Sequence, residues 1–279
     1  VTVDYVNISW LIVQNATDEG KAGINISNVG YANISNNWLT ANNISILLGG
    51  ASNNNLMNNT ASNNGYGIYL VYSSYNLIAN NTADNHTAVS GGGPQMPSSG
   101  IVLIASNHNT LKDNSVSNNI IDIVIFDSTN DTLTNNKALI NFINLIVRPT
   151  FAPDVTYFNH SIDSSNTVNG LPVYYNFSES NIVLDGVNTN HITIANCTNI
   201  TLRNTDVSGG DSITLAFTND SKVENNTASN SLWGILLVFS NNNTLTNNTA
   251  NNNFVQGISL EASNNNTLFN NTVYNNSNT

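Results

Sequence analysis

The chain has 279 residues, and only 8% of them are charged, with six Lys and Arg against 17 Asp and Glu. The formal net charge of −11 and the isoelectric point near 4.3 exclude general binding to nucleic acid or anionic lipid, because both partners need a basic surface. The sequence contains no run of about 18 apolar residues, so no membrane-spanning helix is expected.

A short cassette recurs along the chain and defines its predicted elements. Two clear copies read GILLVFSNNNTLTNNTA from Gly234 and GISLEASNNNTLFNNT from Gly257. Each copy contains short groups of alternating apolar residues, which indicate strands rather than helices. In chain order, the anchor apolar residues of the copies are Ile24, Ile46, Ile68, Ile101, Ile123, Leu145, Leu171, Ile192, Ile213, Ile235 and Ile258.

Repeats that cannot bury an apolar face alone must stack on one another. We therefore predict an all-β fold, a right-handed single-stranded parallel β-helix (solenoid) of about 11 coils of about 22 residues, forming one domain over residues 1–279. Asn suits the corners of such coils, because it tolerates left-handed backbone and its amide can hydrogen-bond between coils. The paired asparagines expected at these corners are Asn58, Asn59, Asn80, Asn81, Asn247, Asn248, Asn270 and Asn271.

Two longer steps between anchors predict insertions. The first, near residues 86–99, is rich in Gly and Pro and is expected to form a loop at one corner. The second, near residues 148–175, begins with Pro149 and Pro153 and gathers aromatic residues. These aromatics favour a small apolar core that closes the break in the stack; the alternative is a platform on which sugars stack.

The segment HSIDSSNTVNGLPVYY, from His160 to Tyr175, followed by coils of the type NNTLTNNTA, resembles the NosD-like β-helix family. That family lies within the wider CASH group of carbohydrate-binding proteins and sugar hydrolases, and the resemblance implies a secreted protein like those of archaeal cell surfaces. Family members are often labelled periplasmic copper-binding proteins. We do not expect copper here, because the histidines His86, His108, His160 and His191 lie in distant coils and no ligand cluster appears.

No catalytic residue, metal site or cofactor is assigned from the sequence. The best-placed carboxylates are Asp163, Asp185, Asp206 and Asp211. Asp185 and Asp206 are 21 residues apart, a spacing that would allow them to stack one coil apart beside Arg203, although one such pair is expected by chance. A solvated salt bridge is favoured there over catalysis. Calcium binding by Asp127, Asn130 and Asp131 is an alternative, although their spacing is not that of a calcium loop. Cys197 is expected to be a small buried residue.

Several features predict export to the cell surface. The chain begins at Val1 without Met, which suggests removal of a signal peptide or precursor segment; a trimmed chain would begin in the same way. Asn-x-Ser/Thr triplets are frequent and are acceptors for N-glycosylation in exported proteins. The candidate glycosylation sites are Asn7, Asn15, Asn25, Asn33, Asn85, Asn130, Asn159, Asn176, Asn199 and Asn219.

An acidic, exported rod without convergent chemistry favours a structural, extracellular cell-surface protein that self-assembles as an S-layer, sheath or filament subunit. Neither end of the sequence shows a capping element, so we expect the last coil to dock on the first coil of another copy or on a neighbouring surface. The expected partners are further copies of the chain and cell-surface glycans. The alternatives are a carbohydrate-binding module and a polysaccharide lyase or hydrolase of the pectinase-like β-helix type.

Overall fold

The computed structural model describes residues 1, 3–87, 97–139, 143–150 and 152–277. The chain is a parallel β-solenoid of about 11 coils of about 22 residues, which confirms the predicted fold class. It divides into two compact units, unit 1 (Val1–Ser161) and unit 2 (Ile162–Thr279). Among the described residues, the one helical element is the 3-10 helix η1 (Val155–Phe158). The prediction of a single domain stays a prediction.

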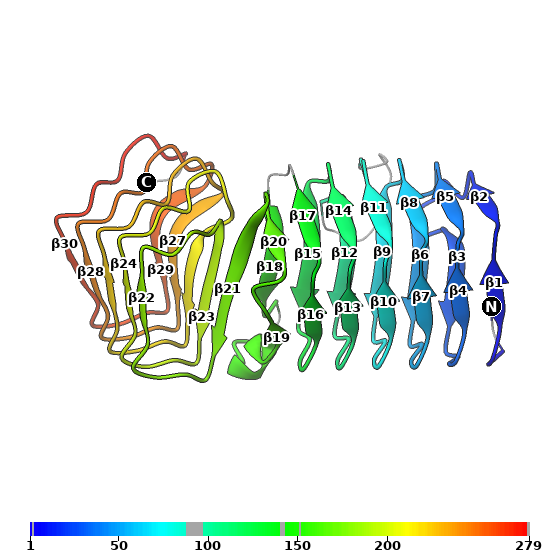
Figure 1. The fold of residues 1–279 in the computed structure, drawn as a ribbon, viewed down its shortest axis with the longest axis horizontal. Helices are drawn as coiled ribbons and strands as arrows, with labels where there is room; N and C mark the ends of the chain where they lie inside the picture. The colour runs from blue at the N-terminus through cyan, green and yellow to red at the C-terminus, as the bar shows by residue number, and fades with distance from the viewer. Residues whose placement is uncertain (2, 88–96, 140–142, 151, 278–279) are drawn as a thin grey trace. The chain divides into compact units, whose positions relative to one another are not determined.

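Within the described part of unit 1, the coils contribute short strands to three parallel sheets, and equivalent strands of successive coils lie side by side (Figure 1). Sheet 1 contains β1 (Asn7–Ser9), β4 (Asn33–Ser35), β7 (Asn55–Met57), β10 (Leu77–Ala79), β13 (Thr110–Lys112) and β16 (Thr132–Thr134). Sheet 2 contains β2 (Ile12–Gln14), β5 (Trp38–Thr40), β8 (Thr60–Ser62), β11 (Thr82–Asp84), β14 (Ser115–Ser117) and β17 (Lys137–Leu139). Sheet 3 contains β3 (Ala22–Ser27), β6 (Ile44–Gly49), β9 (Tyr66–Val71), β12 (Ser99–Ile104), β15 (Ile121–Phe126) and β18 (Ile143–Arg148). The short strand β19 (Ser161–Ile162) follows η1.

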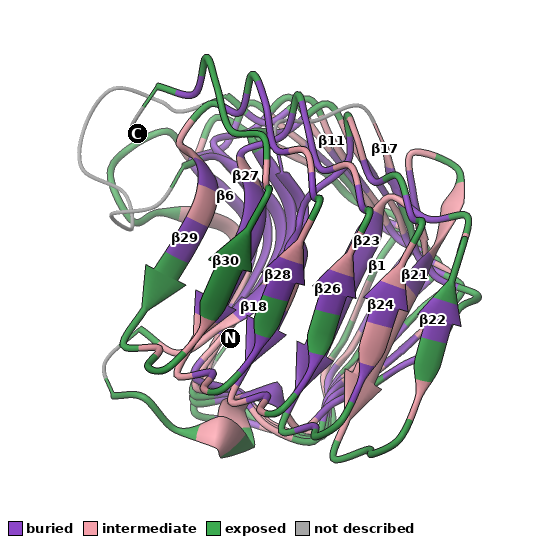
Figure 2. Ribbon diagram, turned by 90° about the vertical axis from the view of Figure 1, so that its left-hand side faces the viewer, coloured by how far each residue is buried: buried purple, intermediate pink, exposed green. Residues whose placement is uncertain are grey.

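Unit 2 begins with a hairpin, in which β20 (Thr167–Val168) pairs antiparallel with the first strand of sheet 4. Sheet 4 contains β21 (Leu171–Phe177), β23 (His191–Ala195), β25 (Ile213–Ala216), β27 (Trp233–Val238) and β29 (Gln256–Glu261). Sheet 5 contains β22 (Val183–Asp185), β24 (Thr201–Arg203), β26 (Lys222–Glu224), β28 (Thr244–Thr246) and β30 (Thr267–Phe269). Figure 2 shows the alternation in β22, β24, β26 and β28 of sheet 5, where buried central residues are flanked by exposed or half-buried ones, whereas β30 is exposed. Isolated bridges join Asp206 to Thr227, Thr227 to Thr249, and Thr249 to Thr272, and they mark a further side of the coils.

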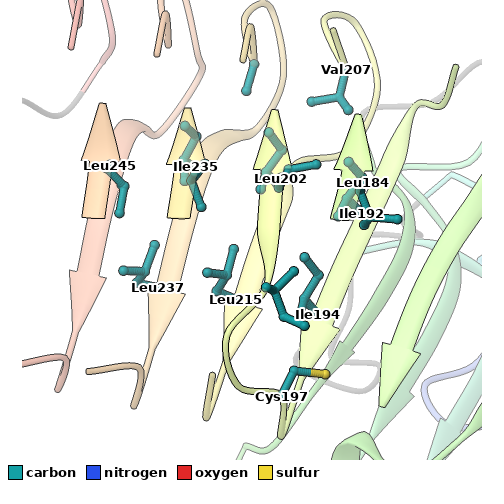
Figure 3. Packing of buried hydrophobic residues seen from close by; sticks show 14 residues of the cluster. Leu184, Ile192, Ile194, Cys197, Leu202, Val207, Leu215, Ile235, Leu237 and Leu245 are labelled. Carbon is teal, nitrogen blue, oxygen red and sulfur yellow. The ribbon is translucent and has the colours of Figure 1, made fainter. Parts of the chain in front are cut away.

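The anchor residues stack in register through each unit. Ile24 pairs with Ile46 and Ile46 with Ile68 in unit 1, and Ile213 pairs with Ile235 in unit 2. The buried cluster of unit 2 shows the result, with side chains such as Leu215 and Leu237 arranged in rows between the sheets (Figure 3). The predicted register of these anchor residues is therefore confirmed.

One predicted anchor is wrong. Leu171 pairs antiparallel with Val168, and Tyr174 is the residue that stands in register with Ile192. The reason is the hairpin turn before β21, where Gly170 has a φ of +83° and reverses the chain. The first coil of unit 2 therefore enters sheet 4 three residues later than the repeat spacing indicates.

The paired asparagines have two different structural roles. The first Asn of a pair sits at a corner with left-handed backbone, as Asn58 does with a φ of 57°. The second points inward and is buried: the Oδ1 atom of Asn59 accepts hydrogen bonds from the backbone and side-chain N–H groups of Asn37, at 3.1 and 2.9 Å. The Asn59 Nδ2 atom donates to the Ile34 carbonyl, at 2.8 Å. The predicted corner and ladder roles of Asn are thus confirmed, but they belong to successive residues.

Three ladders built mainly from Asn run through the described part of unit 1, and each inward side chain bonds to the coil before it in the sequence. The first row consists of Asn54, Asn76, Asn109 and Asp131, and it ends at His160. The second row consists of Asn37, Asn59, Asn81, Asn114 and Asn136. The third row consists of Asn42, Asn64, His86 and Asn119.

Both predicted insertions leave a trace in the register. Ladder partners are 33 residues apart between Asn76 and Asn109, against 22 in most of unit 1. Most of the first insertion, residues 88–96, lies outside the described residues. In the second insertion, Phe158 is buried and Tyr157 is half-buried, as expected for an apolar seal, while Phe151 lies outside the described residues.

Replacing Leu237 by Ala is expected to destabilise the fold by about 2–5 kcal/mol, because the side chain is fully buried. Leu260 occupies the next position of the same row but is 38% exposed, so Leu260→Ala is expected to cost less. Urea unfolding of both variants, followed by circular dichroism, measures the difference. Equal costs would contradict the assigned row.

His86 provides a pH test of the third ladder. Its Nδ1 atom accepts a hydrogen bond from the Asn64 N–H at 3.3 Å, which requires an unprotonated Nδ1, and burial lowers the pKa of the imidazole to about 3. The unfolded chain takes up this proton below about pH 6.5, so stability is complete above that pH and is lost as the pH falls towards 3, by about 1.4 kcal/mol per unit.

His86→Asn is expected to remove this acid-dependent loss, because Asn fills the same ladder position in neighbouring coils. His108→Asn is the matched control, since the exposed corner position of His108 is also occupied by Asn in other coils, as at Asn53 and Asn130. Urea unfolding at a series of pH values compares the variants. An unchanged pH profile in His86→Asn would refute the proposed protonation state.

Candidate functional site

Three charged side chains of unit 2 line up on the outer face of sheet 5. Asp185, Arg203 and Glu224 stand in register on successive coils. The Arg203 guanidinium lies 2.8 Å from Asp185 Oδ2, and Asn204 Nδ2 donates to Asp185 Oδ1 at 2.7 Å. The hydrogen bonds from Asn204 and Arg203 lower the pKa of the Asp185 carboxyl. Both ion-pair side chains are more than two-fifths exposed, so this is the solvated salt bridge that was expected, and it contributes little stability.

Asp185 and Asp206 do not stack, although their 21-residue spacing allowed it. Asp185 pairs with Arg203, whereas Asp206 stands on another side of the coil and bridges to Thr227. The reason is that the first coil of unit 2 needs only 18 residues, the separation of Arg203 from Asp185, so a spacing of 21 does not return the chain to the same position. Asp206 instead accepts a hydrogen bond from the Ser208 N–H at 2.9 Å.

A hydrogen-bonded row of Thr193, His191 and Asp211 is the arrangement in unit 2 that most resembles catalytic machinery. His191 Nδ1 lies 2.8 Å from Asp211 Oδ2, and His191 Nε2 lies 2.9 Å from Thr193 Oγ1. A hydroxyl, an imidazole and a carboxylate in this order can activate a nucleophile. All three residues, however, are no more than 4% exposed. A substrate cannot reach the hydroxyl in this conformation, so the row serves the fold.

The hairpin that opens unit 2 is bonded to the corners near this buried row. Asn190 Nδ2 donates to the Val168 carbonyl at 3.2 Å, and Asn169 Nδ2 donates to the Gly209 carbonyl at 3.3 Å. Sequence reasoning did not pair His191 with Asp211. Their separation of 20 residues, close to one coil, was the available signal.

The residues suggested for calcium point in different directions. Asp127 is buried and accepts a hydrogen bond from the Thr150 N–H at 2.7 Å, Asn130 is an exposed corner residue, and Asp131 is a buried ladder residue. Within the ranges that the structure describes, no group of three or more His, Cys, Asp and Glu side chains is placed to hold a metal ion. Cys197 is buried, as predicted, and burial raises the pKa of its thiol.

The ten candidate glycosylation sites differ in accessibility. The exposed ones are Asn7, Asn15, Asn25, Asn85, Asn130 and Asn199, and the half-buried ones are Asn33, Asn159, Asn176 and Asn219. Asn176 is the least suited acceptor, because it stands in register with the core residue Ile194 and its Nδ2 atom donates to Glu179 Oε2 at 3.1 Å.

Large exposed aromatic side chains gather in the first two coils of unit 1. Trp38 on the outer face of sheet 2 is 55% exposed and stands in register with Ile12, which is 70% exposed. Trp10, at the corner before β2, is 79% exposed. In later coils the outward row of Trp38 holds polar or charged residues, namely Thr60, Thr82, Ser115 and Lys137. We call Trp10, Ile12 and Trp38 the aromatic patch.

The comparisons with known proteins agree with the fold. A family model described as "Periplasmic copper-binding protein (NosD)" matches residues 5–174 and again residues 158–279. No curated protein matches the chain. The N-terminal fragment of gene product 12 of bacteriophage phi29 is similar in fold, with a TM-score of 0.51 and 12% identity over 92% of this chain. The catalytic domain of a GH87 alpha-1,3-glucanase and pectate lyase Pel9A give TM-scores of 0.43 and 0.34, at 14% and 13% identity over 99% and 100% of this chain.

This chain spans 56% of the length of the phi29 and glucanase chains and 70% of the lyase chain. The copper named in the family description finds no fitting ligand set among the described residues. His160 and His191 are engaged by Tyr157, Thr193 and Asp211, and His108 stacks on Tyr75. The described residues also include no helix of the length and apolar character needed to cross a membrane.

Glycan mapping tests the accessibility of the acceptor sites. In native material we expect glycans on exposed acceptors such as Asn85 or Asn130, and unmodified Asn176, because its amide nitrogen is engaged by Glu179. Mass spectrometry of proteolytic peptides gives the occupancy at each position. A glycan found on Asn176 would contradict the assigned orientation of that side chain.

Proposed function

The chain belongs to the NosD family, and we propose that it is an exported, N-glycosylated structural protein of the cell surface that self-assembles through the aromatic patch. The proposal rests on one observation: Trp10, Ile12 and Trp38 are large apolar side chains that face outward, away from the core. Exposed apolar patches of this kind mark interaction sites in soluble proteins.

The patch is a lateral surface. Leu39, between Trp38 and Thr40, points into the core and is fully buried, so its two neighbours in β5 face outward. Core packing therefore does not require Trp at position 38, and Thr60 fills the same outward position in the next coil. The patch adds apolar surface to a chain with a formal net charge of −11, whose copies would otherwise repel one another, and this supports a specific contact.

A lateral contact suits the ladders better than the expected contact between the last and first coils. Each ladder side chain accepts from a backbone N–H of the preceding coil. In the first coil, the equivalent positions are held by Val6, Leu11 and Ala16, whose side chains have no acceptor. If the last coil of another copy docked on this first coil, the backbone N–H groups of that last coil would find no acceptor. Each such buried group would cost binding free energy.

Carbohydrate binding is the second candidate, and the same patch supports it. Exposed Trp rings offer flat apolar faces to the C–H faces of sugars, and the surrounding sheet offers hydroxyl and amide groups. We do not propose catalysis. Glycoside cleavage needs two carboxylates facing one space, and Asp163, Asp185 and Asp211 bond to different partners.

Replacing Trp10 and Trp38 together by Ser is expected to weaken self-association by about 30-fold or more, because truncating a central interface Trp costs about 2 kcal/mol or more. Sedimentation velocity over a range of protein concentrations measures the association. Tyr72→Ser is the matched control, since Tyr72 is a 70% exposed aromatic at a corner in the middle of unit 1.

The outcomes separate the two candidates. A wild-type chain that stays monomeric at high concentration overturns the assembly proposal. If that monomer is retained on insoluble cell-surface polysaccharide and the double variant is not, the patch binds carbohydrate. Equal association of wild type, control and double variant would show that the patch takes no part in assembly.

A further inference from the structure

Asp131 is the chemical exception in the first ladder of unit 1. The preceding members of this row are Asn54, Asn76 and Asn109, and each of the three has one amide oxygen that accepts and one amide nitrogen that donates. An ionised Asp has two acceptors and no donor. The Asp131 side chain is nevertheless completely buried.

The first carboxyl oxygen of Asp131 does what an Asn oxygen does elsewhere in the row. Asp131 Oδ1 accepts a hydrogen bond from the backbone N–H of Asn109 at 2.7 Å and from Asn109 Nδ2 at 3.3 Å. The second oxygen, Oδ2, is buried without a hydrogen-bond partner, and it lies 3.4 Å from His160 Nδ1.

The partners of His160 fix where its proton lies. The backbone N–H of Asp131 points at His160 Nδ1 from 3.2 Å, so Nδ1 accepts and carries no proton. His160 Nε2 lies 3.1 Å from the Tyr157 carbonyl, to which it donates. The ring is therefore neutral, with its proton on Nε2, and the lone pair of Nδ1 is on the side where Asp131 lies.

An ionised Asp131 does not fit this arrangement. Its Oδ2 would be a buried negative charge without a donor, beside the lone pair of a neutral imidazole, and burying an unpaired charge is costly. With a proton on Oδ2, the carboxyl group presents one acceptor and one donor, as Asn does, and the O–H can share the single Nδ1 lone pair of His160 with the Asp131 N–H. We propose that Asp131 is a neutral carboxylic acid at neutral pH that replaces Asn in the ladder, and that loss of its proton at alkaline pH releases the segment from Tyr157 to Ser161.

That segment is attached to the corner where Asp131 stands. The Asn130 N–H donates to the Asn159 carbonyl at 2.6 Å, and Asn159 Nδ2 donates to Asn130 Oδ1 at 2.9 Å. The Ser161 N–H donates to the Asp131 carbonyl at 2.9 Å. His160 lies between these contacts, so a charge appearing on Asp131 acts on the whole attachment. We call residues 157–161 and this corner the latch.

The titratable groups around the latch are His108 on the preceding coil, Asp127 on the same coil, and Asp154 and Tyr157 in the η1 segment. His108 stacks on Tyr75, Asp127 is held by Thr150, and Asp154 accepts from the Thr156 N–H. Burial raises the pKa of Asp131 to about 8, against the opposing effect of the Asn109 hydrogen bonds. Burial also lowers the pKa of His160 to about 4, so the imidazole stays neutral at physiological pH.

The titration of Asp131 can be followed directly by ¹³C NMR of its side-chain carboxyl carbon in the folded wild-type chain. We expect the chemical shift of a protonated acid at pH 6 and a midpoint near pH 8. The Ser161 amide should lose hydrogen-exchange protection over the same pH range. A carboxyl carbon that titrates below pH 5, as an exposed Asp does, would overturn the proposal without any variant.

Asp131→Asn supplies the second test, because Asn is the residue of this row in the preceding coils. A carboxyl pKa raised by folding means that its stabilising contribution is complete below about pH 4 and is lost as the pH rises to about 8, by about tenfold in the folding equilibrium constant per pH unit. The variant should lack this decline and keep Ser161 protected above pH 8. The control Asp113→Asn replaces a half-buried corner Asp, whose side chain is 30% exposed, and should keep the wild-type profile. Matching profiles for the two variants would refute the role of Asp131.

Discussion

The structure depends on the hydrogen bonds between buried asparagine side chains and the backbone of the preceding coil. Every coil has to turn at corners, and a corner breaks the regular strand pairing and leaves backbone N–H and C=O groups inside the protein. A buried group of this kind is costly unless it has a partner. An amide side chain supplies an acceptor and a donor together, as Asn59 does for Asn37 and Ile34. The abundance of Asn follows from this requirement.

Residues that replace Asn in the ladders must also supply an acceptor to a buried N–H group, and for titratable residues the protonation state matters as well. Any side chain that presents an acceptor to the preceding N–H can replace Asn, as Thr218 does for Cys197 and Ser221 does for Ile200. His86 and His160 also meet the condition, but only while the accepting nitrogen is unprotonated. Asp131 meets it in either state, and its second buried oxygen is what favours the protonated form. The ladder therefore tolerates these residues while making the stability of the coil depend on pH. Because the His pKa values are lowered and the Asp131 pKa is raised, the dependences have opposite signs.

The repeat made the fold and most of the core register predictable, because strands in neighbouring coils have to pair at a nearly fixed spacing. Ile24, Ile46 and Ile68 were placed correctly for this reason. The spacing gave the wrong register for Leu171, because a hairpin precedes it. It also gave the wrong register for Asp185 and Asp206, because the coil between Asp185 and Arg203 has only 18 residues. The row of His191 with Asp211 was missed because a residue pair one coil apart is informative only when the coil length is known.

The outward positions obey different constraints from the ladders. Their side chains leave the coil, so the fold accepts Trp38 and Thr60 in the same row, and also Thr246 and Phe269 in the last two coils of sheet 5. The recurring cassette is a part of the sequence that resembles the NosD family. It consists of inward positions and corners, which every stacked coil needs. The specific activity of each member has to depend on the outward positions and insertions, which the cassette leaves free. A family description that names copper is therefore compatible with a chain whose described residues assemble no ligand set for it, and the aromatic patch is the part of this chain where function is best sought.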